Sequence, residues 1–538
     1  MPNDESTERK SQADAASLSR RAFLRATAGA SAAALMSGCA TLPVAARKPV
    51  RHEVQFMRVG IIGCGGRGTG AAIDCLNADP HTQVVALGDL FQHRLDACRK
   101  HLAEHERPQH IEDKHCFAGF DACQGVLSCD VDLVIHGTPP GFRADHLRAI
   151  IEAGKHVFTE KPVAVDPIGV RTVIAAAELA ERKGLAFVAG TQRRHDPAYC
   201  ETMRRIHDGA IGDLVAGQCY WNQGALWVVE REAGWSDMEW QCRNWLYFTW
   251  LSGDHIVEQH IHNLDVMNWA MGGPPVKAVG MGGREVRTDP KYGNVFDHFC
   301  VEYVYPNGAR VLSMCRQMER TSERVGERLI GTKGVADPSG SIEGRRPFKY
   351  EAPGGVWVNP YVQEHVDLLA SIRAGRPLNE GRRVAESTLT AIMGRMSAYT
   401  GRELSWDWLM NASTLDLRPA AYAFGELPVE PVAVPGRTPL VRCVCGGARG
   451  LCIRLSKIRS GAALSDREAA VPLQAAAARF TADAIGVLSA RGIRDARFLG
   501  RALGRATPGQ SRQGSGRVEV HADPLRGCAG RRGRAFGE

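Results

Sequence analysis

The sequence predicts an α/β fold in which a doubly wound parallel sheet is followed by an α+β domain with a mostly antiparallel open sheet. Three observations support this prediction. Short apolar runs alternate with helical segments between residues 57 and 190, the order that builds a parallel sheet. The first of these runs ends in a glycine-rich turn. From Asp213 onward, longer strand-like runs replace the alternation.

The stretch 57–72, MRVGIIGCGGRGTGAA, is typical of a buried strand, a tight turn and the start of a helix. Gly63, Gly65 and Gly68 match G-x-G-x-x-G at the turn. Backbone N–H groups of such a turn approach a pyrophosphate, and the helix N-terminus favours its negative charge. Asp89 ends the next apolar run, about twenty residues further on, where a carboxylate binds the ribose hydroxyls of NAD and repels the 2′-phosphate of NADP. We therefore expect NAD as the cofactor, with NADP less favoured.

Further polar side chains follow later strands of this first domain. Thr138, Lys161 and Gln192 each come just past a predicted strand. Because ligands of parallel sheets bind beyond the carboxyl ends of the strands, we expect these three residues to face the cofactor.

The segment 252–272, SGDHIVEQHIHNLDVMNWAMG, predicts one continuous helix with Asp254 as its N-cap. At 100° per residue, one stripe of that helix carries His255, Glu258, His262, Asp265 and Trp269. Glu258 and His262 then lie one turn apart, where they can hydrogen-bond as an oriented pair.

His260 and His262, with Glu258 as a third ligand, raise the alternative of a metal site. On a helix, however, positions two apart point about 200° away from each other. We therefore expect His260 to be a hydrogen-bonded core histidine and predict no metal site. An extended conformation would place both histidines on one face and restore the metal alternative.

Several motifs together resemble the glucose–fructose oxidoreductase/inositol dehydrogenase (Gfo/Idh/MocA) family. They are the G-x-G-x-x-G turn, the acid after the second strand, Thr138-Pro139-Pro140, Glu160-Lys161-Pro162 and the GTQRRHDPAY stretch, and the likeness covers about residues 57–416. The resemblance implies a Rossmann domain whose cofactor-binding residues are Gly63, Gly65, Gly66, Arg67, Gly68, Asp89, Thr138, Pro139, His146, Glu160, Lys161 and Gln192.

The resemblance also implies three catalytic residues, Lys161, Glu258 and His262. In the family, the lysine contacts both the nicotinamide ribose and the substrate hydroxyl, where an ammonium group stabilises a developing alkoxide. A carboxylate four residues before the histidine holds it as the general base. Here Glu258 stands where the family more often has Asp, which puts the geometry of the pair in question.

Six of the ten tryptophans fall within residues 221–250: Trp221, Trp227, Trp235, Trp240, Trp245 and Trp250. Indole rings stack on the apolar faces of sugars, but packing accounts for at least half of such a cluster. Glu230, Arg231 and Arg243 in the same segment are candidates for binding hydroxyls or an acidic group.

The N-terminal residues 1–46 predict an export signal and linker. Residues 19–25, SRRAFLR, resemble the twin-arginine motif and precede an alanine-rich run. We therefore expect export by the twin-arginine machinery to the periplasm or cell envelope. Residues 36–39, MSGC, resemble a lipobox with Met in place of Leu, so a lipid anchor at Cys39 is an alternative outcome.

The net charge of +8 comes from the C-terminus. Residues 441–538 hold 18 Lys+Arg and 7 Asp+Glu. The rest of the chain therefore carries 49 Lys+Arg and 52 Asp+Glu. A slightly acidic folded part gives nucleic-acid binding no support. We predict an extended strap over 417–440 and a disordered basic tail over 441–538, with a membrane- or nucleic-acid-binding tail as the rival interpretation.

The sixteen cysteines form no C-x-x-C pair and no zinc spacing, so packed thiols are expected.

These observations predict an exported oxidoreductase that acts on a hydroxyl of a sugar, sugar derivative or cyclitol with tightly bound NAD. Residues 57–190 form the NAD-binding domain, and residues 191–416 form the substrate domain, which also supports a homo-oligomer. One alternative is a redox-neutral glycoside hydrolase or lyase similar to glycoside hydrolase family 109, which uses NAD catalytically. The other is a non-catalytic sugar-binding protein.

Overall fold

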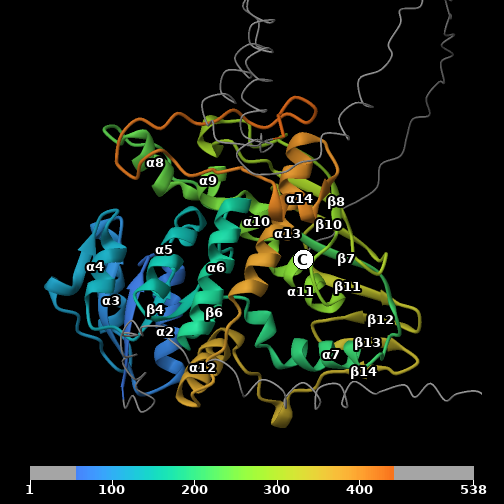
Figure 1. The fold of residues 1–538 in the computed structure, drawn as a ribbon, viewed down its shortest axis with the longest axis horizontal. Helices are drawn as coiled ribbons and strands as arrows, with labels where there is room; N and C mark the ends of the chain where they lie inside the picture. Colours follow the sequence, from blue (N-terminus) through green and yellow to red (C-terminus); the bar gives the residue numbers. More distant parts are fainter. Residues whose placement is uncertain (1–55, 441–538) are drawn as a thin grey trace, which may run out of the picture. The chain divides into compact units, whose positions relative to one another are not determined.

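The computed structural model describes residues 56–440, and the predicted two-sheet architecture is confirmed there (Figure 1). In the first domain, parallel strands alternate with helices in the order β1 (Met57–Ile62), α2 (Gly66–Ala78), β2 (Thr82–Asp89), α3 (Gln92–Ala103), β3 (Cys116–Ala118), α4 (Ala122–Ser128), β4 (Leu133–His136), α5 (Pro140–Glu152), β5 (His156–Thr159), α6 (Pro167–Lys183) and β6 (Phe187–Ala189).

The first sheet has the strand order β3-β2-β1-β4-β5-β6, and every neighbouring pair is parallel. Successive side chains of a strand alternate between two separate apolar clusters, as Ile61 and Ile62 do. Both faces are therefore buried, which is why the strands read as continuous apolar runs. The sequence does not predict β3 or α4, because three residues of strand carry no measurable periodicity.

The glycine turn is held by close backbone packing. Gly63 has a φ of +94°, and its N–H donates to the carbonyl of Gly88 at 2.7 Å. A Cβ on Gly68 would lie 1.8 Å from the carbonyl oxygen of Gly63, and one on Gly137 would lie 2.7 Å from the Gly68 Cα. Glycine is required here because three backbone segments meet without room for a side chain.

The second half of the chain holds a nine-stranded sheet and the remaining helices, one of which, Pro360–Arg373, packs against the first domain through Leu368 and Leu369. Its elements are α7 (Pro197–His207), β7 (Leu214–Gln223), α8 (Asp237–Arg243), α9 (Thr249–Ser252), α10 (His255–Glu258), α11 (Ile261–Met271), β8 (Lys277–Gly283), β9 (His298–Val304), β10 (Arg310–Gln317), β11 (Arg324–Gly331), β12 (Gly334–Asp337), β13 (Ser341–Gly344), β14 (Phe348–Lys349), α12 (Pro360–Arg373), α13 (Gly381–Thr400), β15 (Leu404–Ser405) and α14 (Trp406–Asn411).

This sheet runs β14-β13-β12-β11-β7-β10-β9-β8-β15, antiparallel throughout except for the parallel pair β7 and β10. Helices cover one face: a Cβ on Gly217 of β7 would lie 3.0 Å from Met267 of α11, and one on Gly280 of β8 would lie 3.0 Å from the backbone of α13. The opposite face exposes Val279, Met281 and Leu312.

The prediction of one continuous helix over 252–272 is wrong. The segment forms α10 and α11, separated at Gln259 and His260, and Asp254 caps α10 by accepting from the His255 N–H. The break has a visible cause, because the carbonyl oxygen of Glu258 accepts a hydrogen bond from the Lys161 ammonium. In an unbroken helix that oxygen would accept the amide of His262.

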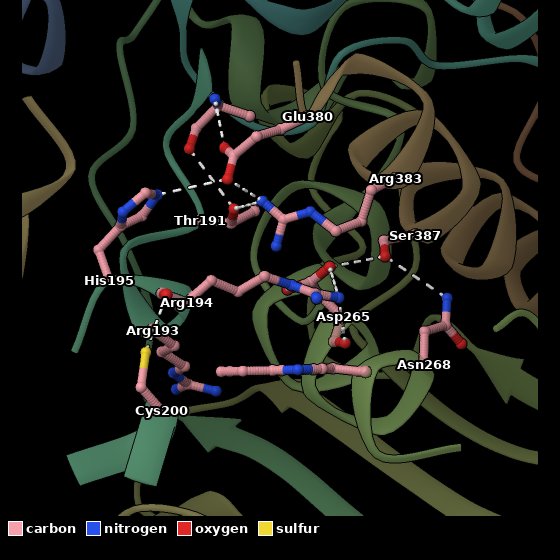
Figure 2. A network of polar contacts seen from close by, with 12 residues as sticks. Thr191, Arg193, Arg194, His195, Cys200, Asp265, Asn268, Glu380, Arg383 and Ser387 are labelled. Atoms are coloured by element: carbon pink, nitrogen blue, oxygen red, sulfur yellow. Dashed lines mark hydrogen bonds and ion pairs between the residues drawn. The ribbon is translucent and has the colours of Figure 1, made fainter. Parts of the chain in front are cut away.

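A network of buried polar groups fixes α11 to its neighbours (Figure 2). Arg194 donates to both carboxylate oxygens of Asp265, at 2.7 and 3.0 Å, and Ser387 of α13 donates to the same carboxylate at 2.8 Å. His195, the residue after Arg194, lies 3.5 Å from Glu380, and Glu380 pairs with Arg383 of α13. The loop that opens the second domain is thus joined to α11 and α13.

Residues 417–440 contain no helix or strand. No helix among residues 56–440 combines the length and hydropathy needed to cross a membrane. The predicted export signal, Cys39 and the predicted basic tail lie outside the described residues.

The network gives the stability of the protein a specific pH dependence. Burial alone lowers the pKa of His195, but the carboxylates of Asp367, 2.6 Å away, and Glu380, 3.5 Å away, outweigh it and raise that pKa to about 9. A raised pKa means that the folded state favours the charged imidazolium. The stabilisation is therefore complete below the unfolded pKa of about 6.5 and is lost as the pH rises through 9.

We expect His195→Gln to remove at most about 3 kcal/mol of unfolding free energy at pH 6.5 and much less at pH 9.5. Urea unfolding of both proteins at the two pH values measures this difference. His110→Gln, at an exposed position, is the matched control and is expected to follow the parent protein. An equal loss at both pH values would contradict a charged His195.

Candidate functional site

One cavity of about 560 Å³ lies between the first sheet and the second domain. Eleven of the twelve predicted cofactor residues line it: Gly63, Gly65, Gly66, Arg67, Asp89, Thr138, Pro139, His146, Glu160, Lys161 and Gln192. The twelfth, Gly68, lies behind the turn against Gly63. Lys161, Glu258 and His262 line the same cavity, so it brings together all the predicted catalytic residues.

The turn that begins α2 has the features of a pyrophosphate site. Gly65 is the N-cap, and no side chain caps the helix or places an acid in its first turn. A Cβ on Gly66 would meet nothing within 4 Å, so the backbone there borders open space. The uncapped N–H groups and the helix dipole are thus available to an anionic ligand in the cavity.

Asp89 is fixed next to this turn. Its carboxylate accepts the N–H of Cys64 at 2.7 Å and the N–H of Phe91 at 2.9 Å. Burial raises the pKa of Asp89, and these two hydrogen bonds act against the rise. Each oxygen keeps a further lone pair, and Asp89 lines the cavity, so the carboxylate can also accept ribose hydroxyls. The residues present therefore fit a dinucleotide.

The Lys161 ammonium lies at the contact between the two domains. It donates to the carbonyl oxygen of Glu258 at 2.5 Å, and lies 3.3 Å from Oε1 of Glu258 and 3.4 Å from Oε1 of Gln259. Its side chain is 9% exposed and that of Glu258 is 13% exposed. The pair is shielded from solvent, and the ammonium is held in one place.

The predicted pairing of Glu258 with His262 differs from the structure. The Glu258 carboxylate lies on Lys161, and within residues 56–440 no hydrogen bond joins it to the His262 ring. The helix break explains the difference, because Glu258 ends α10 while His262 belongs to α11. The structure therefore makes Glu258 a partner of the lysine.

His262 is buried against Trp221, with ring centroids 5.8 Å apart and planes 25° from parallel. Burial holds the pKa of His262 well below its usual value, and the positive charges of Lys161 and Arg193 lower it further. The ring is thus neutral near pH 7 and able to accept a proton.

His260, in contrast, is fully buried away from the cavity and hydrogen-bonds to Ser313 at 2.7 Å and Asn263 at 3.2 Å. The prediction of a core histidine is confirmed. Asp265 and Trp269 of the predicted stripe are structural as well, since Asp265 pairs with Arg194 and the Arg194 guanidinium lies over the Trp269 ring.

Two arginines stabilise the loops around the lysine. Arg67 donates to Glu160 at 2.6 and 2.8 Å, so these two predicted cofactor residues bind each other. Arg143, which sequence reasoning missed, donates to the carbonyls of Thr138, Glu160 and Pro162. Burial lowers its pKa to about 10. Its position one turn into α5 carries no signal of this role.

Aromatic rings make up much of the remaining wall. Trp221, Trp227 and Trp245 line the cavity, while Trp235, Trp240 and Trp250 pack in an apolar cluster. This agrees with the expectation that packing accounts for at least half of the six tryptophans. Arg243 also lines the cavity, whereas Arg231 pairs with Asp237 and Glu230 pairs with Lys291. Sequence reasoning missed other lining residues, including Phe91, Arg94, Phe120, Phe142, Gln259 and Tyr361.

Two family models match the chain, and together they cover about half of it. Residues 57–190 match the model of the oxidoreductase family with an NAD-binding Rossmann fold. Residues 199–337 match the GFO/IDH/MocA C-terminal domain.

Individual relatives are distant. The chain is 26% identical over 226 residues to a glycosyl hydrolase family 109 protein of Shewanella amazonensis, covering 40% of this chain and 48% of that protein. It is 23% identical over 288 residues to an NAD⁺-dependent scyllo-inositol 2-dehydrogenase of Bacillus subtilis, covering 53% and 73%. The chain thus spans about half the length of the first relative and about three quarters of the second.

Among solved structures, the aldose–aldose oxidoreductase of Caulobacter crescentus superposes with a TM-score of 0.52 at 20% identity, over 65% of this chain and 99% of that one. This likeness shows the fold. The two family models establish that residues 57–190 are an NAD-binding Rossmann domain and that the chain belongs to the Gfo/Idh/MocA family of oxidoreductases.

Proposed function

We propose that the protein is an NAD-dependent oxidoreductase that acts on a hydroxyl group of a sugar, a sugar derivative or a cyclitol. One observation carries the proposal: the Lys161 ammonium and the neutral His262 ring line the same cavity as the dinucleotide turn. The inositol dehydrogenases among the relatives support the substrate class.

In this proposal, bound NAD supplies the hydride acceptor. An imidazole nitrogen of His262 takes the proton of the substrate hydroxyl, and the Lys161 Nζ donates a hydrogen bond to the oxygen as negative charge develops there. Glu258 holds the ammonium at the edge of the cavity. Trp221, which packs on His262, offers an apolar surface for a sugar ring.

A second candidate is a redox-neutral glycoside hydrolase or lyase, in which the cofactor returns to its starting state in each turnover. The relative from Shewanella amazonensis, a glycosyl hydrolase family 109 protein, favours this candidate. The same lysine and histidine would serve both reactions.

We further propose export by the twin-arginine route to the periplasm or cell envelope, with a lipid anchor at Cys39 as an alternative. Residues 19–25 and 36–39 support this proposal. A cofactor carried through export would stay bound and be regenerated within each catalytic cycle. Identification of the mature N-terminus in an envelope fraction tests the proposal, and an uncleaved protein found only in the cytoplasm would contradict it.

We propose that the protein forms a homo-oligomer through the open face of the second sheet. That face exposes Val279, Met281 and Leu312, and the Met281 side chain is 72% exposed. Exposed apolar side chains on one sheet face are typical of a subunit interface. Sedimentation of the purified protein as a monomer at micromolar concentration would contradict this.

The reaction class is tested with cyclitols, aldoses and glycosides, each with and without added NAD. We expect a cyclitol or aldose to yield oxidised product and reduced NAD in equal amounts. Glycoside cleavage without net consumption of NAD would replace the dehydrogenase with the second candidate.

Lys161→Met is expected to lower kcat/KM by about 10²–10³-fold, because it removes the donor to the developing alkoxide. It also removes a positive charge near His262, so the pKa of His262 rises. The acid limb of the remaining activity should therefore move to higher pH. Lys114→Met removes a surface lysine paired with Glu112 and is the control. Full activity in Lys161→Met would exclude the lysine from the reaction.

A further inference from the structure

The C-terminal strap, residues 417–440, lies outside both segments that match the family models. Rings of its first half pack on Phe91, Phe120 and Phe142, which form a wall of the cavity that Asp89 also lines. Because Phe91 follows Asp89 by two residues and both line the cavity, we assign this wall to the end that takes the adenosine half of a dinucleotide.

Two rings of the strap support that wall from outside. Phe424 stacks on Phe91, with centroids 6.1 Å apart and planes at 18°, and packs on Phe120 at 5.1 Å. Tyr422 packs on Phe120 at 6.3 Å and on Phe142 at 5.3 Å. Neither strap ring lines the cavity itself. The strap therefore holds the wall in place without being part of it.

The strap is also tied to α8, which belongs to the second domain. The carbonyls of Gly425 and Leu427 accept hydrogen bonds from the Met238 N–H at 3.1 Å and the Gln241 side chain at 2.6 Å. The Leu427 N–H donates to Asp237 at 3.1 Å.

Helix α8 reaches the same wall through Arg243. The guanidinium carbon lies 4.0 Å above the Phe91 ring and 4.5 Å from the centroid of Trp235. Phe91 thus contacts both an arginine of the second domain and a phenylalanine of the strap. Cation–π and ring-stacking contacts are both attractive, so together they oppose separation of the wall.

At its beginning the strap is anchored to the first domain. The Leu417 N–H donates to the carboxylate of Asp166 at 2.8 Å, and Arg418 pairs with Asp145 at 3.3 Å. The strap therefore joins the two domains across the adenosine end of the cleft, and the contacts around Tyr422 and Phe424 must separate before that end can open.

We propose that residues 417–428 are a latch that controls entry and release of the dinucleotide at its adenosine end. The inference rests on the proposed function only in its claim that NAD stays bound between turnovers. A latch acts on exchange in both directions. Its loss therefore accelerates association and dissociation together and changes the equilibrium affinity little, whereas loss of a direct contact accelerates dissociation alone.

The test measures association and dissociation rate constants of NADH by stopped-flow fluorescence, with excess NAD⁺ as the chase, in the absence of substrate. We expect the double variant Tyr422→Ala/Phe424→Ala to raise both rate constants at least tenfold, with Kd within about threefold of the parent protein. Phe424→Leu keeps an apolar side chain but loses the stacked ring, so it should raise both constants less. If the double variant fails to fold, Phe424→Leu alone tests the latch.

Trp357→Ala, which removes an exposed ring outside the latch, is the control and should leave both constants unchanged. Unchanged rate constants in the two latch variants would overturn the proposal, as would faster dissociation with unchanged association. Because no substrate is present, a failed dehydrogenase assay leaves these rate constants valid. Failure of the parent protein to bind NADH would overturn both the latch and the proposed function.

Discussion

The hydrogen bond from the Lys161 ammonium to the carbonyl oxygen of Glu258 is the contact on which the cleft depends. Lys161 follows a strand of the first domain, and Glu258 ends a helix of the second. The bond occupies a carbonyl oxygen that would accept the next helical hydrogen bond in an unbroken helix. Helix α10 therefore ends there, and α11 begins as a separate helix. Because of the break, the Glu258 carbonyl is available to bind the ammonium, and His262 lines the cavity from a different helix.

The position of the buried Lys161 ammonium depends on the helices and loops around it, and other buried polar groups fix these. A second buried ion pair, Arg194 with Asp265, fixes α11 and is itself connected to α13 through Ser387 (Figure 2). Arg143 ties the loops after β4 and β5 through three backbone carbonyls. Breaking a buried pair by removing one partner costs more than the pair contributes, so these groups specify one arrangement of the cleft.

Much of the fold follows from the sequence, because local patterns determine it. The apolar runs, the glycine turn and the acid at Asp89 lie within single strand–turn–helix units, and the parallel sheet brings their ends to one edge. Eleven predicted cofactor residues reach the cavity for this reason. The break at Gln259 is not predictable in this way, since it depends on a lysine 97 positions earlier in the chain. The same holds for the strap, whose packing on Phe91 and Phe120 joins distant segments.

We propose that one cleft holds NAD with its nicotinamide end at Lys161 and its adenosine end at Phe91. A crystal structure of the protein with NAD measures this most directly. We expect the ribose hydroxyls of the adenosine half on Asp89, the pyrophosphate on the N–H groups at the start of α2, and the nicotinamide ring beside Lys161 and His262. A dinucleotide bound in the reverse direction, or with its nicotinamide away from Lys161, would contradict it.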